Sequence, residues 1–542
     1  MEFNLTEEAW IRVRDAQCRV TELPLPEALM NAHRYKALAG ESPAQDAAIL
    51  RLLIAVAYTV FYRTNEQGQA SELEDEDEAL DRWEAIWNLG QLPAEPIRIY
   101  FEKWRGRFDL LDEERPFYQV PEAKIGTPHT AAKLNGVILQ SENKQRIFSS
   151  RTETSSGTLS CAEAARWLVY LQGYDDASVK PKTEEGKRNV KTKPGSARGW
   201  LGNLGLLYAV GDNLFETVWL NTIFLRDGGE LYGKPEPCWE LSHPRAGEYT
   251  RIPMAEDLAG LFSLQGRRVL LKRDGDNVVA YSEYCGDLLE QQDAFAEPMT
   301  VWKPLRKKNE IIGYLPRPQS PGRQLWRDFS AVAVQSSENR LPGIVYWLEM
   351  LQDKGCLEPD CFFRFAAVSA LYDSSGSSVI NTISDSLSFH ADLLGKAGQD
   401  WQTRIVDQIH FTEKLADALG LLAGELAVAA GKRETENKKL IPPQKMSVAE
   451  TAKALFYFRV DGAFRQWLLL PKAGQGIDEK KALHEQWRET ARNITISQGR
   501  ELAEQAGEAA FLGRWVKPDG EKTIHYSSAE AFNRFLRSVQ NA

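Results

Sequence analysis

Two stretches of the sequence concentrate basic side chains with few acids between them. The stretch from Val179 to Gly199 carries seven Lys or Arg against two Glu, and the stretch from Lys303 to Arg327 carries seven against one Glu. Clustered Lys and Arg side chains neutralise phosphates, and glycines among them let the backbone approach a ligand closely. Both stretches are therefore candidates for binding a polyanion. The alternative for each is an ordinary solvated basic surface.

Motifs that mark common catalytic sites are absent from the sequence. The segment KPGSARG lacks the Gly-Lys-Ser/Thr ending of a phosphate loop, and Gly199-x-x-Gly-x-x-Gly205 is not a dinucleotide-binding fingerprint. Neither G-x-S-x-G nor H-E-x-x-H occurs. The seven His and six Cys are scattered without the spacing of metal ligands, so we expect neither a metal site nor a cofactor.

The overall charge is acidic, but it is unevenly distributed. The net charge of -10 would count against nucleic-acid binding if it were spread evenly. The segment from Glu72 to Asp81 alone holds seven acids and no base, so the remainder is nearly balanced and leaves room for basic surfaces. We interpret this acidic run as a solvated face or loop.

Composition predicts a packed globular protein in the cytoplasm. The chain has 542 residues, of which 43% are hydrophobic, and it contains 15 Trp. The N-terminus lacks the basic region and the apolar region that make up a secretory signal. The apolar run from Leu52 to Tyr62 is too short to span a bilayer. Scattered cysteines fit reduced thiols.

The first part of the chain predicts a mixture of strands and helices. Residues 10–23 alternate apolar and polar around a turn, which indicates a β-hairpin, and a second hairpin is predicted around the turn at 274–277. Ser42 is a suitable N-cap for a long apolar helix with Pro43 in its first turn. Residues 161–172 predict another helix, which ends at Gly173.

The last part of the chain predicts a helical bundle. Apolar residues recur at three and four from about Val379 to Ala542, with breaks at Gly431, Pro442-Pro443 and Gly474. Three or four long helices with short connections pack most simply up and down. We therefore predict an α+β protein, with a mixed α/β domain over 1–375 and a helical bundle domain over 376–542.

Four segments, taken together and in order, resemble one known family. They are AWIRV near the N-terminus, SPAQDAAILRLLIAVAY, RPFYQV, and GLFSLQGRRVLL from Gly260 to Leu271. The chain resembles the CasA-type large subunit of the type I-E CRISPR Cascade complex over nearly its full length. The resemblance implies a large mixed α/β N-terminal domain followed by a C-terminal four-helix bundle.

The resemblance also implies a function without catalysis. Members recognise the short protospacer-adjacent motif (PAM) in double-stranded DNA, help to open the duplex, and recruit a helicase–nuclease. Their partners are the other Cascade subunits, the 5′ end of the guide RNA and the target DNA. Guide pairing reads the long target, so the protein reads only a short tag. The sequence does not specify which PAM is read, because minor-groove readout is degenerate.

The family's functional elements map onto three places in this sequence. A loop that anchors the subunit to the guide matches Phe148, Ser149 and Ser150, although Phe148 alternatively packs in a core. A glycine-bearing PAM loop matches 194–199, and a basic hairpin whose lysine enters the minor groove matches LRKKNE. The implied DNA-binding residues are Lys191, Lys193, Gly195, Ser196, Arg198, Gly199, Lys307 and Lys308.

The sequence departs from the family in two features. Some members carry a cysteine cluster that resembles a zinc site, and the matching region here has none, so no metal is implied. Some members part the strands with a Gln-bearing hairpin, but the matching turn has no Gln and holds Asp373, Ser374 and Ser375. Asp373 would repel phosphate.

Two other function classes stay open from the residues alone. One is a cytoplasmic enzyme with an α/β catalytic domain and a helical accessory domain, whose site is assembled from residues distant in the sequence. The other is a structural scaffold. An enzyme would show a pocket with perturbed titratable groups, whereas the DNA-binding interpretation predicts salt-sensitive DNA binding by the isolated chain.

Overall fold

The computed structural model of this chain divides into two compact units. It describes residues 2–137, 157–177, 198–242, 255, 257–287, 289, 296–336, 338–358, 360–436, 439–516 and 523–542. Unit 1 comprises residues 1–321, 335–358 and 364–386, and unit 2 comprises 322–334, 359–363 and 387–542. The predicted domain boundary at residue 375 lies in the turn between two strands, β11 (Phe362–Tyr372) and β12 (Val379–His390), that both units share.

Helix α2 (Pro43–Arg63) forms the centre of unit 1. Ser42 caps it by accepting the Gln45 N–H at 3.2 Å, as predicted. The helix is long and apolar enough to cross a membrane, but its most apolar window is 94% buried inside the fold, as in the core helix of a folded domain. The other α-helices in the described residues of unit 1 are α1 (Leu25–Met30), α3 (Glu76–Leu89), α4 (Ala94–Trp104), α5 (Ala131–Leu134), α7 (Cys161–Tyr174), α8 (Leu214–Leu220), α9 (Leu258–Phe262) and α11 (Gly343–Asp353).

Buried tryptophans join helices that are far apart in the sequence. The indole N–H of Trp83 donates to the carbonyl of Trp219 at 3.0 Å, and that of Trp219 donates back to the carbonyl of Trp83 at 2.9 Å. The two indoles stack with their centroids 6.3 Å apart. Each buried indole thus satisfies its donor while contributing a large apolar area to the core.

Unit 1 also contains several small antiparallel sheets. Both predicted hairpins are confirmed: β1 (Ile11–Arg14) pairs with β2 (Val20–Leu23), and β7 (Arg267–Asp274) pairs with β8 (Asn277–Cys285). Strand β6 (Leu206–Ala209) pairs with β11, which gives the sheet order β12-β11-β6. The remaining strands are β3 (Ala37–Leu38), β4 (Thr127–Thr130) and β5 (Leu159–Ser160), together with the hairpin described next.

A two-stranded hairpin follows, made of β9 (Trp302–Lys307) and β10 (Glu310–Pro316). Lys307 pairs with Glu310, so the loop consists of two residues, Lys308 and Asn309. Both have positive φ, at 48° and 69°. Two successive residues of positive φ define a type I′ turn, whose twist matches that of the flanking strands.

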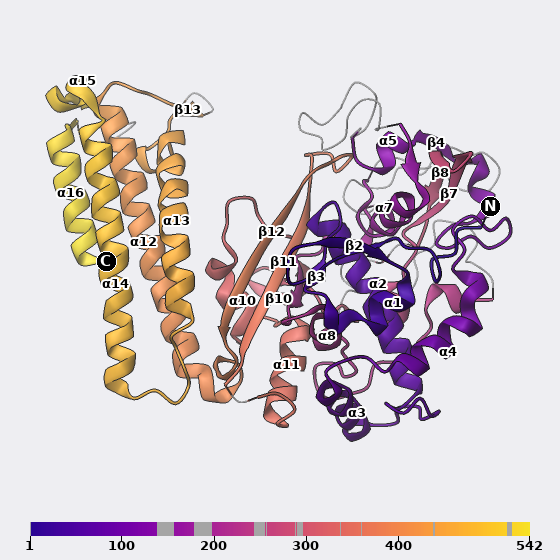
Figure 1. The fold of residues 1–542 in the computed structure, drawn as a ribbon. Helices are drawn as coiled ribbons and strands as arrows, with labels where there is room; N and C mark the ends of the chain where they lie inside the picture. Colours follow the sequence, from indigo (N-terminus) through magenta and orange to yellow (C-terminus); the bar gives the residue numbers. More distant parts are fainter. Residues whose placement is uncertain are drawn as a thin grey trace. The chain divides into compact units, whose positions relative to one another are not determined.

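Unit 2 is a bundle of long helices, as predicted. Helix α12 (Gln399–Ala429) packs against α13 (Ser447–Leu468), α14 (Ile477–Glu504) and α16 (Ser528–Asn541), and these four helices run side by side in Figure 1. Trp487 lies in the core and donates its indole N–H to Thr412 Oγ1 at 3.1 Å. Shorter elements are α10 (Phe329–Ala333), α15 (Gly507–Leu512), and the strand pairs β13 (Thr435–Glu436) with β14 (Lys439–Leu440) and β15 (Arg514–Val516) with β16 (Ile524–Tyr526).

The prediction of helix from residue 379 onward is wrong for its first part. Residues Val379–His390 form strand β12, which pairs with β11, and the first bundle helix begins at Gln399. The segment TISDSLSFH alternates residue types with a period of two, which is the strand pattern. The helical periodicity begins only after it.

The pH dependence of stability is predicted from Asp46, in the first turn of α2. Burial raises the pKa of its carboxyl to about 6, although the Gly40 N–H donates to it at 2.7 Å and nearby arginines favour its ionised form. Because the folded carboxyl holds its proton more tightly than the unfolded one, this group stabilises the fold below its unfolded pKa. That contribution is lost as the pH rises through about 6.

Asp46→Asn keeps the acceptor for Gly40 and removes the charge. We expect it to raise the free energy of unfolding by about 1–2 kcal/mol near pH 7.5 and to change it little near pH 4. Urea denaturation at both pH values measures the difference, with the exposed Asp353→Asn as the control. The same gain at both pH values would contradict the assignment.

The type I′ turn predicts that Lys308 is conformationally strained. A positive φ raises the conformational energy of a residue that has a Cβ, whereas glycine adopts it without this cost. Lys308→Gly is therefore expected to stabilise the hairpin by about 0.5–1 kcal/mol, seen as slower amide hydrogen exchange in β9 and β10. Lys307→Ala, a change within the strand, serves as the control. Faster exchange in Lys308→Gly would show that the lysine side chain itself supports the turn.

Candidate nucleic-acid interface

The tip of the β9–β10 hairpin presents lysines to solvent. Lys303, Lys307 and Lys308 are exposed. Within the described part of the chain, none of the three has an acidic partner. Arg306, between them, pairs with Glu338 at 3.2 Å. The free positive charge of the hairpin is therefore carried by its lysines.

The apolar side chains of this hairpin are only partly buried. Ile312 is 56% exposed and Leu305, on the facing strand, is 37% exposed, whereas Ile311, Tyr314 and Leu315 are half-buried. A hairpin without a covering layer exposes both of its faces near the tip. The tip therefore extends beyond the body of unit 1 as a thin, two-stranded projection.

The base of the hairpin is attached to the β12-β11-β6 sheet. The Val301 N–H donates to the Gly205 carbonyl at 3.1 Å, and the Arg317 N–H donates to the Val301 carbonyl at 2.8 Å. Beyond β10, the Gln319 N–H donates to Ser369 Oγ on β11 at 3.0 Å. These bonds fix the direction in which the lysine-bearing tip projects.

The second predicted DNA-binding segment ends beside this same sheet. Lys191, Lys193, Gly195 and Ser196 lie outside the described residues, and so do Phe148, Ser149 and Ser150 of the predicted anchoring loop. Arg198 and Gly199 are described. The Gly199 N–H donates to the Asp175 carbonyl at 2.9 Å, and a Cβ on Gly199 would collide with the Gly173 carbonyl. The described contacts of Gly199 are thus with the end of α7 and with the residues that follow it in the chain, and its approach to DNA stays a prediction.

The turn that matches the strand-parting hairpin of some family members lies between β11 and β12 and is tight and negatively charged. Asp373 accepts hydrogen bonds from the Ser377 N–H at 2.8 Å and from the Ser375 hydroxyl at 3.0 Å. Slight burial favours the protonated form, but these hydrogen bonds outweigh it and hold the pKa of Asp373 below its ordinary value. Ser374 and Ser375 are exposed at the tip. The turn is therefore anionic, which does not suit a phosphate contact.

A buried carboxylate connects α2 to the roots of both candidate elements. Glu297 accepts two hydrogen bonds from the Arg51 guanidinium at 2.8 and 2.9 Å. It also accepts the indole N–H of Trp200 at 2.8 Å and the Met299 N–H at 3.1 Å. Trp200 begins the short helix η4 (Trp200–Asn203) directly after Gly199, and Met299 lies just before β9.

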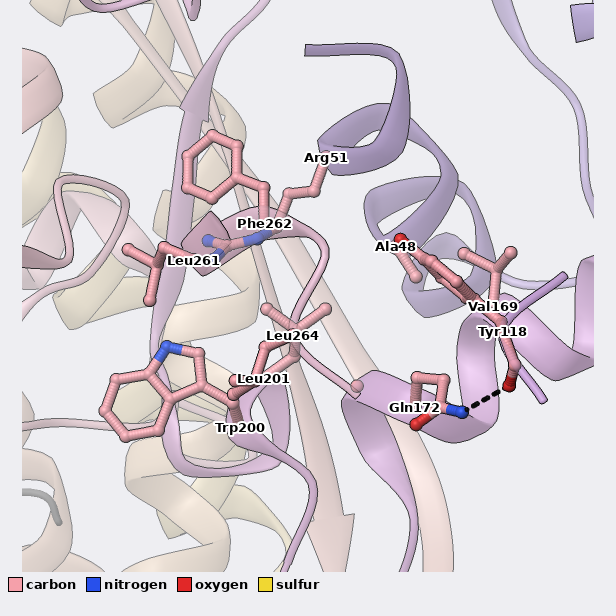
Figure 2. Close-up of a pocket in the computed structure, with 11 residues that line it drawn as sticks. Ala48, Arg51, Tyr118, Val169, Gln172, Trp200, Leu201, Leu261, Phe262 and Leu264 are labelled. Atoms are coloured by element: carbon pink, nitrogen blue, oxygen red, sulfur yellow. Dashed lines mark hydrogen bonds between the residues drawn. The ribbon is translucent and has the colours of Figure 1, made fainter. Parts of the chain in front are cut away.

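A small cavity lies beside this cluster, as Figure 2 shows. Its volume is about 30 Å³, and Arg51, Phe262, Trp200 and Gln172 are among its lining residues. The side chain of Gln172 donates to the carbonyl of Tyr118 at 3.0 Å. A volume of this size holds about one water molecule and is far below that of a small-molecule site.

Ion pairs also connect the starts of the two predicted loops. Lys133 lies 3.6 Å from the carboxylate of Asp176 and 4.0 Å from that of Glu283. The neighbouring Asp175 pairs with Arg267, and both are almost fully buried. Lys133 shortly precedes residues 138–156, and Asp176 shortly precedes 178–197. In the described part of the chain, no group of three or more His, Cys, Asp or Glu is placed to hold a metal ion.

The basic stretch from Lys303 to Arg327 is not one surface. Its last two bases belong to unit 2, where Arg323 pairs with Asp328 at 2.9 Å. Arg327 pairs with Glu413 at 3.2 Å and stacks on Tyr457, with its guanidinium 3.6 Å from the ring centroid. Because these arginines are engaged in intramolecular contacts, the candidate interface includes only the basic residues of the hairpin.

Sequence reasoning missed several residues that build this region. No recognisable sequence motif contains the following residues of this region: Tyr372, Ser369, Glu297 and Trp200. Arg51 did carry a signal, because an arginine inside the apolar helix segment ILRLLIAVAY requires a buried partner. That partner, Glu297, is 246 residues away.

Comparison with known proteins assigns the family. The sequence model of the family described as CRISPR-associated protein Cse1 matches residues 4–498. A curated relative, the CRISPR-associated protein CasA/Cse1 of Thermus thermophilus, is 26% identical over 502 residues, which cover 91% of each chain.

Solved structures agree with this assignment. The crystal structure of Thermobifida fusca Cse1 is 26% identical, covers 100% of this chain and 98% of its own, and superposes with a TM-score of 0.81. A chain in a structure described as a CRISPR RNA-guided surveillance complex shares the fold, with a TM-score of 0.64, 18% identity and 99% of each chain covered. The resemblance drawn from the sequence is confirmed, and the chain belongs to the CRISPR-associated Cse1 family.

Proposed function

We propose that this chain is the large, non-catalytic subunit of an RNA-guided CRISPR surveillance complex, and that it recognises the PAM in double-stranded DNA. The observation that carries the proposal is the β9–β10 tip, where Lys307 and Lys308 are exposed on a thin projection and have no acidic partner among the described residues. Family membership, together with a structural relative described as part of a surveillance complex, supports the assembly.

The physical argument rests on the shape and charge of the hairpin tip. A minor groove about 6 Å wide admits a narrow element such as a side chain or a tight turn more readily than a helix. The Lys308–Asn309 turn is the narrowest part of the hairpin, and its lysines are free to contact phosphates or base edges. The bonds at Val301 and Arg317 hold the tip in a fixed direction, so little ordering is needed on binding.

The proposal extends to the steps that follow recognition. In the assembled complex the subunit contacts the other Cascade subunits and the 5′ end of the guide RNA, helps to open the duplex, and recruits the helicase–nuclease. It acts in the cytoplasm and without a cofactor. We assign no strand-parting role to the turn at Asp373, Ser374 and Ser375, because its charge is negative and it lacks a Gln.

The hairpin is tested by replacing Lys307 and Lys308 separately by Ala in the assembled complex. Duplexes with and without a PAM are titrated at several salt concentrations. A lysine that contacts a phosphate should flatten the log–log salt slope by roughly 0.9 and weaken all duplexes equally. A lysine that contacts a base edge should cost about 1–3 kcal/mol on the PAM duplex and change the other little.

Lys354→Ala provides the matched control for the removal of one positive charge. Lys354 is an exposed lysine whose ammonium lies 3.5 Å from Glu76, within the acidic segment from Glu72 to Asp81. Its loss should leave the slope unchanged. If Lys307→Ala and Lys308→Ala bind every duplex as Lys354→Ala does, the hairpin does not contact DNA and is a solvated basic turn.

The absence of catalysis is tested on the purified chain. We expect neither DNA cleavage nor ATP hydrolysis in the presence of Mg²⁺ or Mn²⁺, because the sequence has no phosphate loop. The assay follows both activities across the fractions of a final chromatography step. Nicking or phosphate release that rises and falls with the chain would favour the enzyme alternative.

A further inference from the structure

Asn309 occupies a turn position at which glycine is the favoured residue. Lys308 and Asn309 are the two central residues of the type I′ turn, with φ of 48° and 69°. Such turns favour Asn-Gly, Asp-Gly or Gly-Gly. Asparagine tolerates positive φ better than most residues, but glycine adopts it without cost. The turn alone therefore does not explain why the chain places an amide side chain at its second central position.

The side chain of Asn309 is exposed and has no hydrogen-bond partner among the described residues. Asparagines in turns and caps often bond the neighbouring backbone with their side-chain oxygen. Three others in this chain do so and accept a backbone N–H two or three residues further on, at 3.2, 3.1 and 2.9 Å: Asn65, Asn135 and Asn213. The amide of Asn309 makes no such local bond and remains available to an external partner.

The backbone of Asn309 is supported although its side chain is free. Arg306 Nη1 donates to the Asn309 carbonyl at 3.3 Å. The same guanidinium pairs with Glu338 at 3.2 Å. The amide therefore lies on a turn that is held from the strand side, and its presentation requires little ordering on binding.

The hydrogen-bonding capacity of Asn309 differs from that of the other side chains at the tip. Lys307 and Lys308 can only donate. Glu310 can accept, but phosphates on both sides of a narrow groove would repel its charge. Asn309 is neutral, and its side chain both donates and accepts. In the minor groove A·T pairs present only acceptors, whereas a G·C pair adds the guanine N2 amino donor.

We propose that Asn309 reads a G·C base pair in the minor groove of the PAM. Its Oδ1 accepts a hydrogen bond from the guanine N2 amino group, while Lys307 and Lys308 supply positive charge beside it. A lysine alone cannot favour G·C, because its ammonium has no lone pair to accept from that amino group. This inference rests on the proposed function and adds to it the residue that distinguishes G·C from A·T.

The inference is tested in the assembled complex with inosine, which lacks only the N2 amino group of guanine. Binding to duplexes that carry every base-pair combination next to the guide-matched sequence first identifies the preferred PAM, and inosine then replaces each of its guanines. At one position inosine should weaken binding by the parent about threefold to tenfold. Asn309→Gly should lose the same factor on the guanine duplex, and inosine at that position should weaken it no further.

Asn309→Gly also separates base reading from support of the turn. Because glycine suits positive φ, amide hydrogen exchange in β9 and β10 of the isolated chain should become slower even though DNA binding weakens. The log–log salt slope should stay that of the parent, since no charge is removed. The matched control is Asn277→Gly, at an exposed asparagine beside the turn of the β7–β8 hairpin, and it should bind every duplex as the parent does.

Four results would overturn base reading by Asn309 and leave the proposed function in place. They are a preferred PAM without a G·C pair, a parent that binds inosine and guanine duplexes alike, and an Asn309→Gly variant that responds to inosine as the parent does. The fourth is faster exchange in the hairpin of Asn309→Gly with equal weakening on all duplexes, which would show that Asn309 only supports the turn. A parent complex that binds PAM and non-PAM duplexes alike would instead overturn the proposed function, and this inference with it.

Discussion

The carboxylate of Glu297 is the constraint on which the candidate interface depends. It is fully buried, and its two oxygens accept four hydrogen bonds, from both terminal nitrogens of Arg51, from Trp200 and from the Met299 N–H. A buried charge pair is tolerated only when its partners satisfy it completely, and removing one partner costs about 3–5 kcal/mol. Glu297 therefore holds three parts of unit 1 together. They are helix α2, the start of η4 after the basic segment, and the base of the β9–β10 hairpin.

Local patterns in the sequence predicted the elements but not their meeting points. The hairpin β7–β8 follows from its turn chemistry, α2 from its cap and apolar residues, and the bundle from its periodicity. Strand β12 was missed because the helical pattern that follows it was extended back to residue 379, although the residues of β12 alternate in the strand pattern and pair with β11. The contacts of Arg51 with Glu297 and of Arg198 with Tyr372 join residues that are far apart in the sequence. Such contacts depend on tertiary packing, which a single sequence does not display.

In the stretch from Lys303 to Arg327, three arginines are occupied by intramolecular ion pairs, whereas the three lysines have no acidic partner among the described residues. Arg306, Arg323 and Arg327 each pair with a carboxylate, and Arg198 stacks on a tyrosine. Lysine suits the exposed tip because its ammonium is a mobile point charge on a flexible stem, whereas the planar guanidinium suits fixed partners. The division between structural arginines and free lysines explains why counting bases in the sequence overestimated the size of the basic surface.

Three glycines spaced three residues apart show how closely the parts of this region are packed. A Cβ on Gly199 would collide with the Gly173 carbonyl at the end of α7, and one on Gly202 with the Tyr372 hydroxyl of β11. A Cβ on Gly205 would collide with the Arg317 carbonyl just beyond β10. The Gly-x-x-Gly-x-x-Gly spacing does not match a nucleotide-binding fingerprint. It has a packing role, because each glycine lets the backbone or ring of a different neighbour come close. The end of the helix that precedes the basic segment, strand β11 and the chain just beyond the lysine hairpin thus converge on the stretch from Gly199 to Gly205, where close contacts place them relative to one another.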